Sequence, residues 1–345
     1  MIVDCHGHIT HPHVLRRFPA PPSLGDVDGI IEDKLAAGID LTILASPGGS
    51  GPLVPVPGFD HDNQPRDALR AFHDWLAGVV SARREHLRAY VYCHPFADDA
   101  ALADAAATAK LDGFVGFLTL SSAQGEYLDS PRAAGFLAMA ADAGRPVLVH
   151  PGPKPVAATG ITDYGLVEMV GRYCDVMIGM AAVVLSGVLE RHPGLCLIAA
   201  SGGGALAQLA DRIDWAQRPP HWAPRAQWPA LLAPGAGGAP PAAPGGPGGG
   251  GPRHRPRTTA PASELLRRLY VDTTADSYHS HQANHAVFGA GHMLFGTDSP
   301  PLPVLYGKKL CAIRDLPIRA ADTEAILGGN AVRLFGLADV AAEVN

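Results

Sequence analysis

The chain has 345 residues, of which 47% are hydrophobic and 17% charged, and its formal net charge is −6. This composition is typical of a soluble globular protein, and it excludes the strongly basic surface of a nucleic-acid-binding protein. No signal-peptide pattern follows Met1, and no apolar run reaches about 18 residues, so we expect a cytoplasmic protein with no membrane partner. The five cysteines are scattered and form no CxxC pair, which predicts reduced thiols.

Short apolar segments recur along the chain, and most are followed by turn residues and then an Ala-rich helical pattern. This alternation predicts repeated strand–helix units and a parallel sheet in an α/β fold. Eight such units favour closure into a (β/α)₈ TIM-like barrel over an open doubly wound sheet. The expected strands are Ile2–Cys5, Leu41–Ala45, Leu87–Cys93, Gly113–Leu118, Pro146–His150, Leu195–Ala200, Leu269–Thr274 and His292–Gly296.

Helical patterns fill most of the intervals between these strands. The expected helices include Asp28–Gly38, Asp67–Ala82, Asp98–Lys110, Pro131–Ala143 and Tyr164–Arg191. Residues 234–257, between the sixth and seventh strands, are instead rich in Pro, Gly and Ala and end in a basic run. Such a composition buries too little apolar surface to offset the entropy of ordering. We therefore expect one barrel domain, residues 1–345, with residues 234–257 as a flexible insertion or, alternatively, a mobile lid.

The strongest local motif is Asp4-Cys5-His6-Gly7-His8, at the end of the first strand. Residues two apart in a strand point to the same face, so His6 and His8 present two imidazoles together. Imidazole is the commonest metal ligand in proteins, and β/α barrels place their chemistry at the C-terminal ends of strands. The pair is therefore a candidate half of a metal site.

Two further strand ends carry candidate ligands. His150 directly follows the apolar fifth strand, and Asp298 follows the eighth. A lone histidine at a strand end is commonly a hydrogen-bonded structural residue, but four such groups at one face of a barrel point to a shared site. Three histidines, one aspartate and a position open to solvent are typical of catalytic zinc, which lowers the pKa of water.

Several segments, taken in order, resemble the amidohydrolase superfamily. More narrowly, they are similar to the amidohydrolase-2 group typified by aminocarboxymuconate semialdehyde decarboxylase and the γ-resorcylate-type decarboxylases. The segments are DCHGH (4–8), VLVHP (147–151), SGGG (201–204), LYVDT (269–273), LFGTDSP (294–300) and ILGGNAVRLFGL (326–337). The resemblance implies one divalent metal ion, normally zinc and sometimes manganese, held by His6, His8, His150 and Asp298. The fourth strand ends without a lysine, so a binuclear site with a carbamylated lysine is not expected.

Ser201 departs from the pattern of this group. In its decarboxylases, the glycine triplet follows a histidine that acts as acid and base, and a serine hydroxyl does not titrate near neutral pH. Three explanations remain open: different chemistry, transfer of the role to another histidine, or a substitution that disables the site. His94, at the end of the third strand, is the first candidate for a relocated base, although a structural role is the simpler interpretation.

Other polar residues are candidates for contacts with substrate. His279 and His281 follow the seventh strand on a segment that borders the active face, where they either line the pocket or face solvent. Arg66 is a candidate to hold a substrate carboxylate, against the ordinary expectation of a solvated charge. We list Asp298, Ser201 and His94 as candidate catalytic residues and His279, His281 and Arg66 as candidate substrate-binding residues.

The resemblance favours a non-oxidative decarboxylase of an aromatic or unsaturated carboxylic acid, acting on a small-molecule substrate. The alternative is a metal-dependent hydrolase of an amide, lactone or related bond, or a biosynthetic cyclase or hydratase, in which the metal activates water and Asp298 shuttles the proton. A third hypothesis is a barrel that binds a ligand without turnover, because a fold alone does not prove a function. A homodimer is compatible with the long Ala-rich helices and with the habit of related enzymes.

Overall fold

The computed structural model describes residues 1–217, 257–301 and 305–344. Within these residues, parallel strands form one eight-stranded sheet in the order β1-β2-β3-β4-β7-β8-β9-β10. The strands are β1 (Val3–His8), β2 (Leu41–Ala45), β3 (Leu87–Tyr92), β4 (Phe114–Leu120), β7 (Val147–His150), β8 (Leu197–Ala199), β9 (Tyr270–Asp272) and β10 (Met293–Leu294). All eight predicted strands are confirmed, with ends that differ by a few residues.

The first and last strands of the sheet meet each other. Gly7 and Ser299 form a parallel bridge, and the Cys5 N–H donates to the Phe295 carbonyl at 2.9 Å. The Asp298 N–H donates to the His6 carbonyl at 2.8 Å. These contacts bring the ends of the sheet together, so the fold is the predicted (β/α)₈ barrel.

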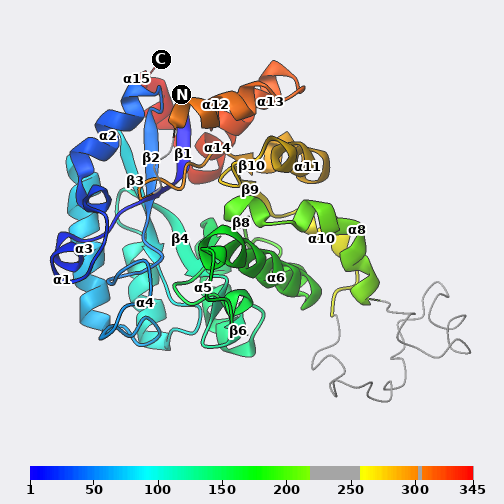
Figure 1. Cartoon of the computed structure of the whole chain (residues 1–345), viewed down its shortest axis with the longest axis horizontal. Coiled ribbons are helices and arrows are strands. Elements are labelled where there is room, and N and C mark those ends of the chain that lie inside the picture. Colours follow the sequence, from blue (N-terminus) through cyan, green and yellow to red (C-terminus); the bar gives the residue numbers. More distant parts are fainter. Residues whose placement is uncertain (218–256, 302–304, 345) are drawn as a thin grey trace, which may run out of the picture.

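Helices surround the strands on the outside (Figure 1). They are α1 (Pro12–Arg17), α2 (Val27–Ala36), α3 (Arg66–Ala82), α4 (Asp99–Thr108), α5 (Ala134–Ala143), α6 (Arg172–Leu185), α7 (Val188–Arg191), α8 (Leu206–Gln217), α10 (Ala262–Leu266), α11 (Tyr278–Phe288), α12 (Tyr306–Arg314), α13 (Ala320–Glu324), α14 (Asn330–Phe335) and α15 (Ala338–Val344). The two termini lie on the same side of the molecule, with α15 near the start of β1 (Figure 1).

Buried side chains of the strands divide between two apolar clusters. One includes Leu44, Val91 and Phe117 and packs against helices such as α3 and α5. The other includes Ile43, Tyr90 and residues of α14. This division follows from the period of two in a strand, which sends neighbouring side chains to opposite faces of the sheet. A rigid scaffold of this kind holds the strand ends in place.

The structure corrects some predicted boundaries. The single helix predicted for Tyr164–Arg191 is wrong: it is a π-helical turn (Val167–Gly171), then α6, then α7. Gly187, at φ +76°, separates α6 from α7, because a left-handed residue cannot continue a right-handed helix. A small hairpin of β5 (Ser122–Ala123) and β6 (Glu126–Tyr127) was not predicted. The predicted insertion, residues 234–257, lies outside the described residues apart from its last residue.

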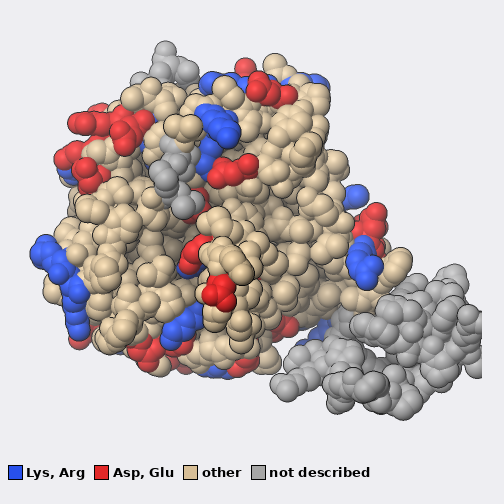
Figure 2. All heavy atoms as spheres, viewed as in Figure 1, with Lys and Arg blue, Asp and Glu red and all other residues tan. Residues whose placement is uncertain are grey.

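None of the helices in the described residues combines the length and the apolar character needed to cross a membrane. Acidic and basic side chains are interspersed on the face seen in Figure 2, among many uncharged residues. This distribution matches the modest net charge of −6.

Candidate metal centre

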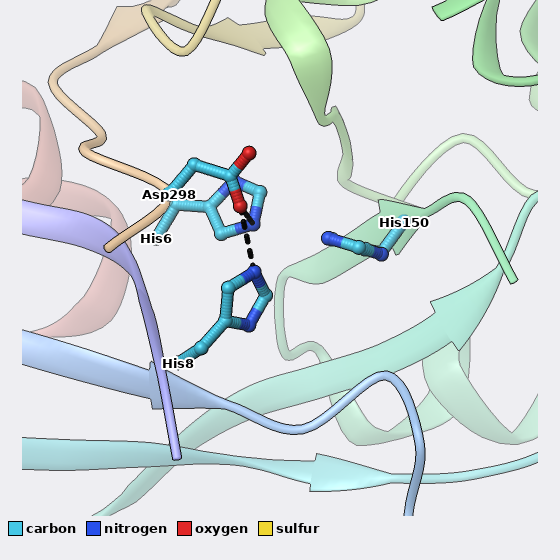
Figure 3. Close-up of side chains that lie close together, drawn as sticks. All are labelled: His6, His8, His150 and Asp298. Carbon is cyan, nitrogen blue, oxygen red and sulfur yellow. Dashed lines mark hydrogen bonds and ion pairs between the residues drawn. The ribbon is translucent and has the colours of Figure 1, made fainter. Parts of the chain in front are cut away.

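The three histidines and the aspartate predicted as ligands come together at one end of the barrel. His6 and His8 are supplied by β1, His150 ends β7, and Asp298 follows β10. The three imidazole centroids lie 4.9 to 5.1 Å apart. One ligand atom from each of the four residues lies within 4.8 Å of the others. The side chains point toward a common centre (Figure 3), although 292 residues separate His6 from Asp298 along the chain.

Each imidazole is oriented through its Nδ1 atom. His6 Nδ1 donates to Asp272 Oδ2 at 2.6 Å, His150 Nδ1 donates to the Pro151 carbonyl at 2.8 Å, and His8 Nδ1 lies 3.3 Å from the Ala45 carbonyl. An Nδ1 that carries the proton leaves Nε2 with a free lone pair, which is the form that binds a metal. The protein therefore presents the Nε2 atoms to the centre of the cluster.

The buried atoms of the cluster fit a divalent metal ion. His6 Nε2 is buried and has no hydrogen-bond partner among the described residues, which is rare for a buried polar atom. His8 Nε2 lies 2.7 Å and His6 Nε2 lies 3.6 Å from the same oxygen, Asp298 Oδ1. Three imidazole nitrogens and one carboxylate match the ligand preferences of zinc and manganese.

Asp298 is held in an uncommon backbone conformation. Its φ is +59°, in the left-handed region that costs a non-glycine residue conformational energy. Burial would raise the pKa of Asp298, but the hydrogen bond with His8 and the nearby His6 and His150 lower it below its usual range. Its side chain is 25% exposed, whereas the three histidines are 6% exposed or less. Asp298 is therefore the member of the cluster that a substrate or solvent can reach.

The pKa values of His150 and His6 shift in opposite directions. Burial, reinforced by the neighbouring His6 and His8, lowers the pKa of His150 well below its ordinary value. Burial also acts to lower the pKa of His6, but the hydrogen bond to Asp272 and the charges of Asp298, Asp272 and Asp4 together outweigh it, and the pKa of His6 is raised. A buried imidazole without a carboxylate partner stays neutral, which is the state required of a ligand.

Asp272, at the end of β9, contacts the cluster but was not among the predicted site residues. Its Oδ1 accepts hydrogen bonds from the Gly202 N–H at 2.7 Å, the Thr274 N–H at 3.1 Å and the Thr274 hydroxyl at 2.8 Å. Its Oδ2 orients His6. The signal available in the sequence was a carboxylate near the end of an apolar strand, comparable to Asp298, which follows the eighth strand.

Ser201 begins the turn that follows β8. It is buried at φ +56°, and the next three glycines also have positive φ. The turn is joined to the cluster through Gly202, whose N–H binds the same Asp272 that orients His6. Asn284 of α11 donates to the Gly202 carbonyl at 2.9 Å and holds the other side of the turn. Ser201 thus lies on a turn joined through Asp272 to the metal cluster.

His94 lies at the end of β3, beside a cavity of about 350 Å³ whose lining includes Asp62, Gln64 and Arg66 but none of the four cluster residues. Its Nδ1 accepts a hydrogen bond from the Phe96 N–H at 3.1 Å, so in the neutral ring the proton resides on Nε2, 3.7 Å from Asp62. Burial lowers the pKa of His94, and Asp62 offsets only part of that effect.

The remaining candidates have contrasting surroundings. His279 is exposed on α11, whereas His281 of the same helix is buried, with its Nδ1 unpartnered among the described residues. Burial lowers the pKa of His281. Arg66 is 43% exposed and donates to Asp104 of α4 at 2.8 Å, a carboxylate that it shares with Arg70. A substrate carboxylate would therefore have to compete with Asp104 for Arg66.

Comparison with known proteins shows the family of the chain. A family model described as Amidohydrolase matches residues 3–337. The chain belongs to the amidohydrolase family. No curated protein sequence matches it.

Solved structures share the fold of this amidohydrolase at low sequence identity. The 5-carboxyvanillate decarboxylase of Sphingomonas paucimobilis is 20% identical with a TM-score of 0.73, over 97% of this chain and 98% of that one. The 2,6-dihydroxybenzoate decarboxylase from Rhizobium is 20% identical with a TM-score of 0.73, over 98% and 99%. A dihydroxybenzoic acid decarboxylase from Polaromonas, solved with manganese and 2-nitroresorcinol, is 18% identical with a TM-score of 0.73, over 98% and 97%. The family and the His/Asp cluster together support a divalent metal ion.

Proposed function

We propose that the chain is a metal-dependent, non-oxidative decarboxylase of an aromatic or unsaturated carboxylic acid. The observation that carries the proposal is the cluster of three buried imidazoles and one partly exposed carboxylate, in an amidohydrolase barrel whose structural neighbours include several such decarboxylases. A fold is compatible with many reactions, so the argument rests on the site.

We assign the metal ion to His6, His8, His150 and Asp298, as a zinc or manganese ion. When bound, a divalent ion supplies Lewis-acid chemistry: it neutralises anionic oxygens and lowers the pKa of water. The protein holds the site ready through the Nδ1 contacts of its three histidines. This preorganisation lowers the cost of binding, because the imidazoles need not reorient.

Decarboxylation requires one proton at carbon. The bond between that carbon and the carboxylate breaks, its electron pair stays on the carbon, CO₂ leaves, and a proton takes its place. We assign this proton transfer to Asp298, because it belongs to the cluster and its side chain is 25% exposed. The Asp298 carboxylate, whose pKa is lowered, would first take up this proton from a substrate hydroxyl or from solvent, and solvent would restore the hydroxyl proton of the product.

The other candidates have smaller roles in this proposal. Ser201 lies in the turn after β8, and His281 is buried on α11, the helix whose Asn284 holds that turn; we propose that both contact the substrate. We propose His94, beside the cavity at the end of β3, as an alternative acid. His279 and Arg66 are not needed, because one is exposed and the other pairs with Asp104. We further propose that the protein is cytoplasmic, in keeping with its five free cysteines. We also propose that residues 1–345 form a single domain and that the protein assembles as a homodimer.

Hydrolysis of an amide or lactone is the second candidate function, and Ser201 is the observation that favours it. A serine at this buried position does not deliver a proton to carbon at neutral pH. Hydrolysis with a metal-activated water and Asp298 as the proton carrier has no need of a histidine at position 201.

The test measures CO₂ release by the metal-loaded protein and by its Ser201→His variant. The substrate panel contains 2,6-dihydroxybenzoate, 5-carboxyvanillate and related aromatic acids. Release by the wild-type protein is the expected result, and its loss in an Asp298→Asn variant that still binds one metal ion assigns the proton to Asp298. If metal is bound but neither the wild-type protein nor Ser201→His releases CO₂ from any of these acids, the decarboxylase proposal is abandoned in favour of hydrolysis.

A further inference from the structure

A buried ion pair lies behind the metal cluster, between β1 and α2. Asp4 is fully buried and Lys34 of α2 is 1% exposed, and the Lys34 ammonium donates to Asp4 Oδ2. Burying two charges costs several kcal/mol per ion, so a pair of this kind is weak ground for stability alone. The contacts of the Asp4–Lys34 pair indicate its role.

Asp4 joins the two segments that carry metal ligands. Its Oδ1 accepts hydrogen bonds from the His6 N–H at 3.0 Å and the Thr297 N–H at 2.9 Å. Its Oδ2 accepts a further bond from the Thr297 hydroxyl at 2.6 Å. One carboxylate therefore fixes the backbone of His6 and of the residue before Asp298.

Lys34 holds Ser299, the residue that follows Asp298. Its ammonium donates to the Ser299 carbonyl at 3.1 Å and to the Thr297 hydroxyl at 3.2 Å. Asp298, at φ +59°, thus lies between two residues that Asp4 and Lys34 hold on both sides. A strained conformation persists only where its surroundings impose it, and these bonds supply that constraint.

The glycine of the DCHGH motif makes room for this arrangement. A Cβ on Gly7 would lie 2.9 Å from Lys34 Nζ and 2.5 Å from the Thr42 side chain. Because Gly7 has no side chain, the Lys34 ammonium can lie against the backbone between His6 and His8. A side chain at this position would displace Lys34 or Thr42.

We propose that Lys34 is a positioning residue for the metal centre. Acting through Asp4 and Thr297, it holds the His6 backbone and the strained turn of Asp298 in the geometry that binds a divalent ion. The inference rests on the ligand set assigned under the proposed function, but it concerns metal affinity and not the reaction catalysed.

The test measures the Kd for Mn²⁺ of metal-stripped protein by calorimetry, together with the thermal midpoint of the apoprotein. Lys34→Met alone leaves Asp4 as an unpaired buried charge, so the main variant is the neutral double substitution Asp4→Asn/Lys34→Met. Thr297→Val, which removes the shared hydroxyl but no charge, is the milder second variant. Lys309→Met is the matched control, because Lys309 is also buried, pairs with Asp276 and contacts none of the four ligands.

We expect Mn²⁺ binding to weaken about tenfold or more in the double variant and at least about threefold in Thr297→Val, and to stay unchanged in Lys309→Met. If the double variant does not fold, the Kd of Thr297→Val for Mn²⁺ tests the inference alone. A folded variant that binds Mn²⁺ within about twofold of wild-type overturns the inference, as does an equal loss in Lys309→Met. A wild-type protein that binds neither Mn²⁺ nor Zn²⁺ overturns the assigned metal site itself, and is distinguished in this way from a failure of Lys34 alone.

Discussion

Substitution of Asp272 by Asn should weaken metal binding by inverting the tautomer of His6. The amide oxygen of Asn can keep the three bonds that Oδ1 accepts from Gly202 and Thr274, so the turn after β8 stays in place. The amide nitrogen then occupies the position of Oδ2, 2.6 Å from His6 Nδ1. Two donors cannot face each other at that distance, so Nδ1 becomes the acceptor and the proton moves to Nε2, the atom that faces the cluster.

The expected magnitude follows from the loss of one orienting partner. Removing the partner of a metal-bound histidine typically costs about 10- to 100-fold in metal affinity, or about 1.4 to 2.7 kcal/mol. Calorimetric titration of metal-stripped Asp272→Asn with Mn²⁺ or Zn²⁺ measures this loss directly. The circular dichroism spectrum should match that of the wild-type protein, because most of the hydrogen bonds of Asp272 survive.

Asp175→Asn is the matched control for this experiment. Asp175 is also fully buried and accepts bonds from the Ser121 and Ser122 hydroxyls and the Ala157 N–H, but it contacts none of the four ligands. The two hydroxyls can rotate to accept from an amide, so the control should bind metal normally. Metal affinity in Asp272→Asn within about threefold of wild-type, or an equal loss in Asp175→Asn, would refute the tautomer argument.

Three further predictions concern stability. Burial lowers the pKa of His73, whose Nε2 accepts the Tyr92 N–H, from 6.5 to about 4. The pKa of His73 is lower in the folded protein than in the unfolded chain. Its contribution to the free energy of unfolding is therefore fully present above about pH 6.5 and should fall by about 2 kcal/mol between pH 7 and pH 5. Urea titrations at both pH values should show a smaller decline for His73→Gln, and an identical decline would remove His73 as the cause. Gly204 has φ +62° and ψ −118°, and a Cβ there would lie 2.4 Å from the Tyr173 carbonyl oxygen. In Gly204→Ala the positive φ alone should lower the free energy of unfolding by about 1 to 3 kcal/mol, and the clash should lower it further. Urea unfolding measures the total loss. Gly38→Ala, at φ +84° with nothing within 4 Å, should lose less, and equal losses would contradict the steric explanation. Chelation should lower the free energy of unfolding by about 2.7 kcal/mol when the metal had been present at a hundred times its Kd. A thermal midpoint that EDTA leaves unchanged would argue against a bound ion.

The sequence predicted the barrel because each of its strands is a short apolar run bounded by turn residues, a local signal that needs no knowledge of distant contacts. The continuous helix predicted through Gly187 failed for a related reason. Glycine is tolerated inside helices, and only the packing of α6 and α7 decides that this one adopts a φ of +76°.

The candidate site shows the same division between local and long-range information. His6, His8, His150 and Asp298 each lie at or after the end of an apolar segment, so their position at one face could be inferred from the order of the elements. The roles of Asp272 and Lys34 could not, because they depend on contacts across the fold. Asp272 meets His6 across 266 residues of sequence, and Lys34 meets Thr297 across 263. Nothing in the neighbourhood of either residue marks its partner.

Stepwise reconstitution is the most direct test of the proposed function. Metal-stripped protein is titrated with Mn²⁺ and assayed for CO₂ release from 2,6-dihydroxybenzoate and related acids after each addition. The account predicts that activity rises in proportion to added metal and stops at one ion per chain, and that His150→Ala shows no such rise. Decarboxylation by the metal-free protein, or an endpoint of two ions per chain, would contradict the assignment of a single ion to His6, His8, His150 and Asp298.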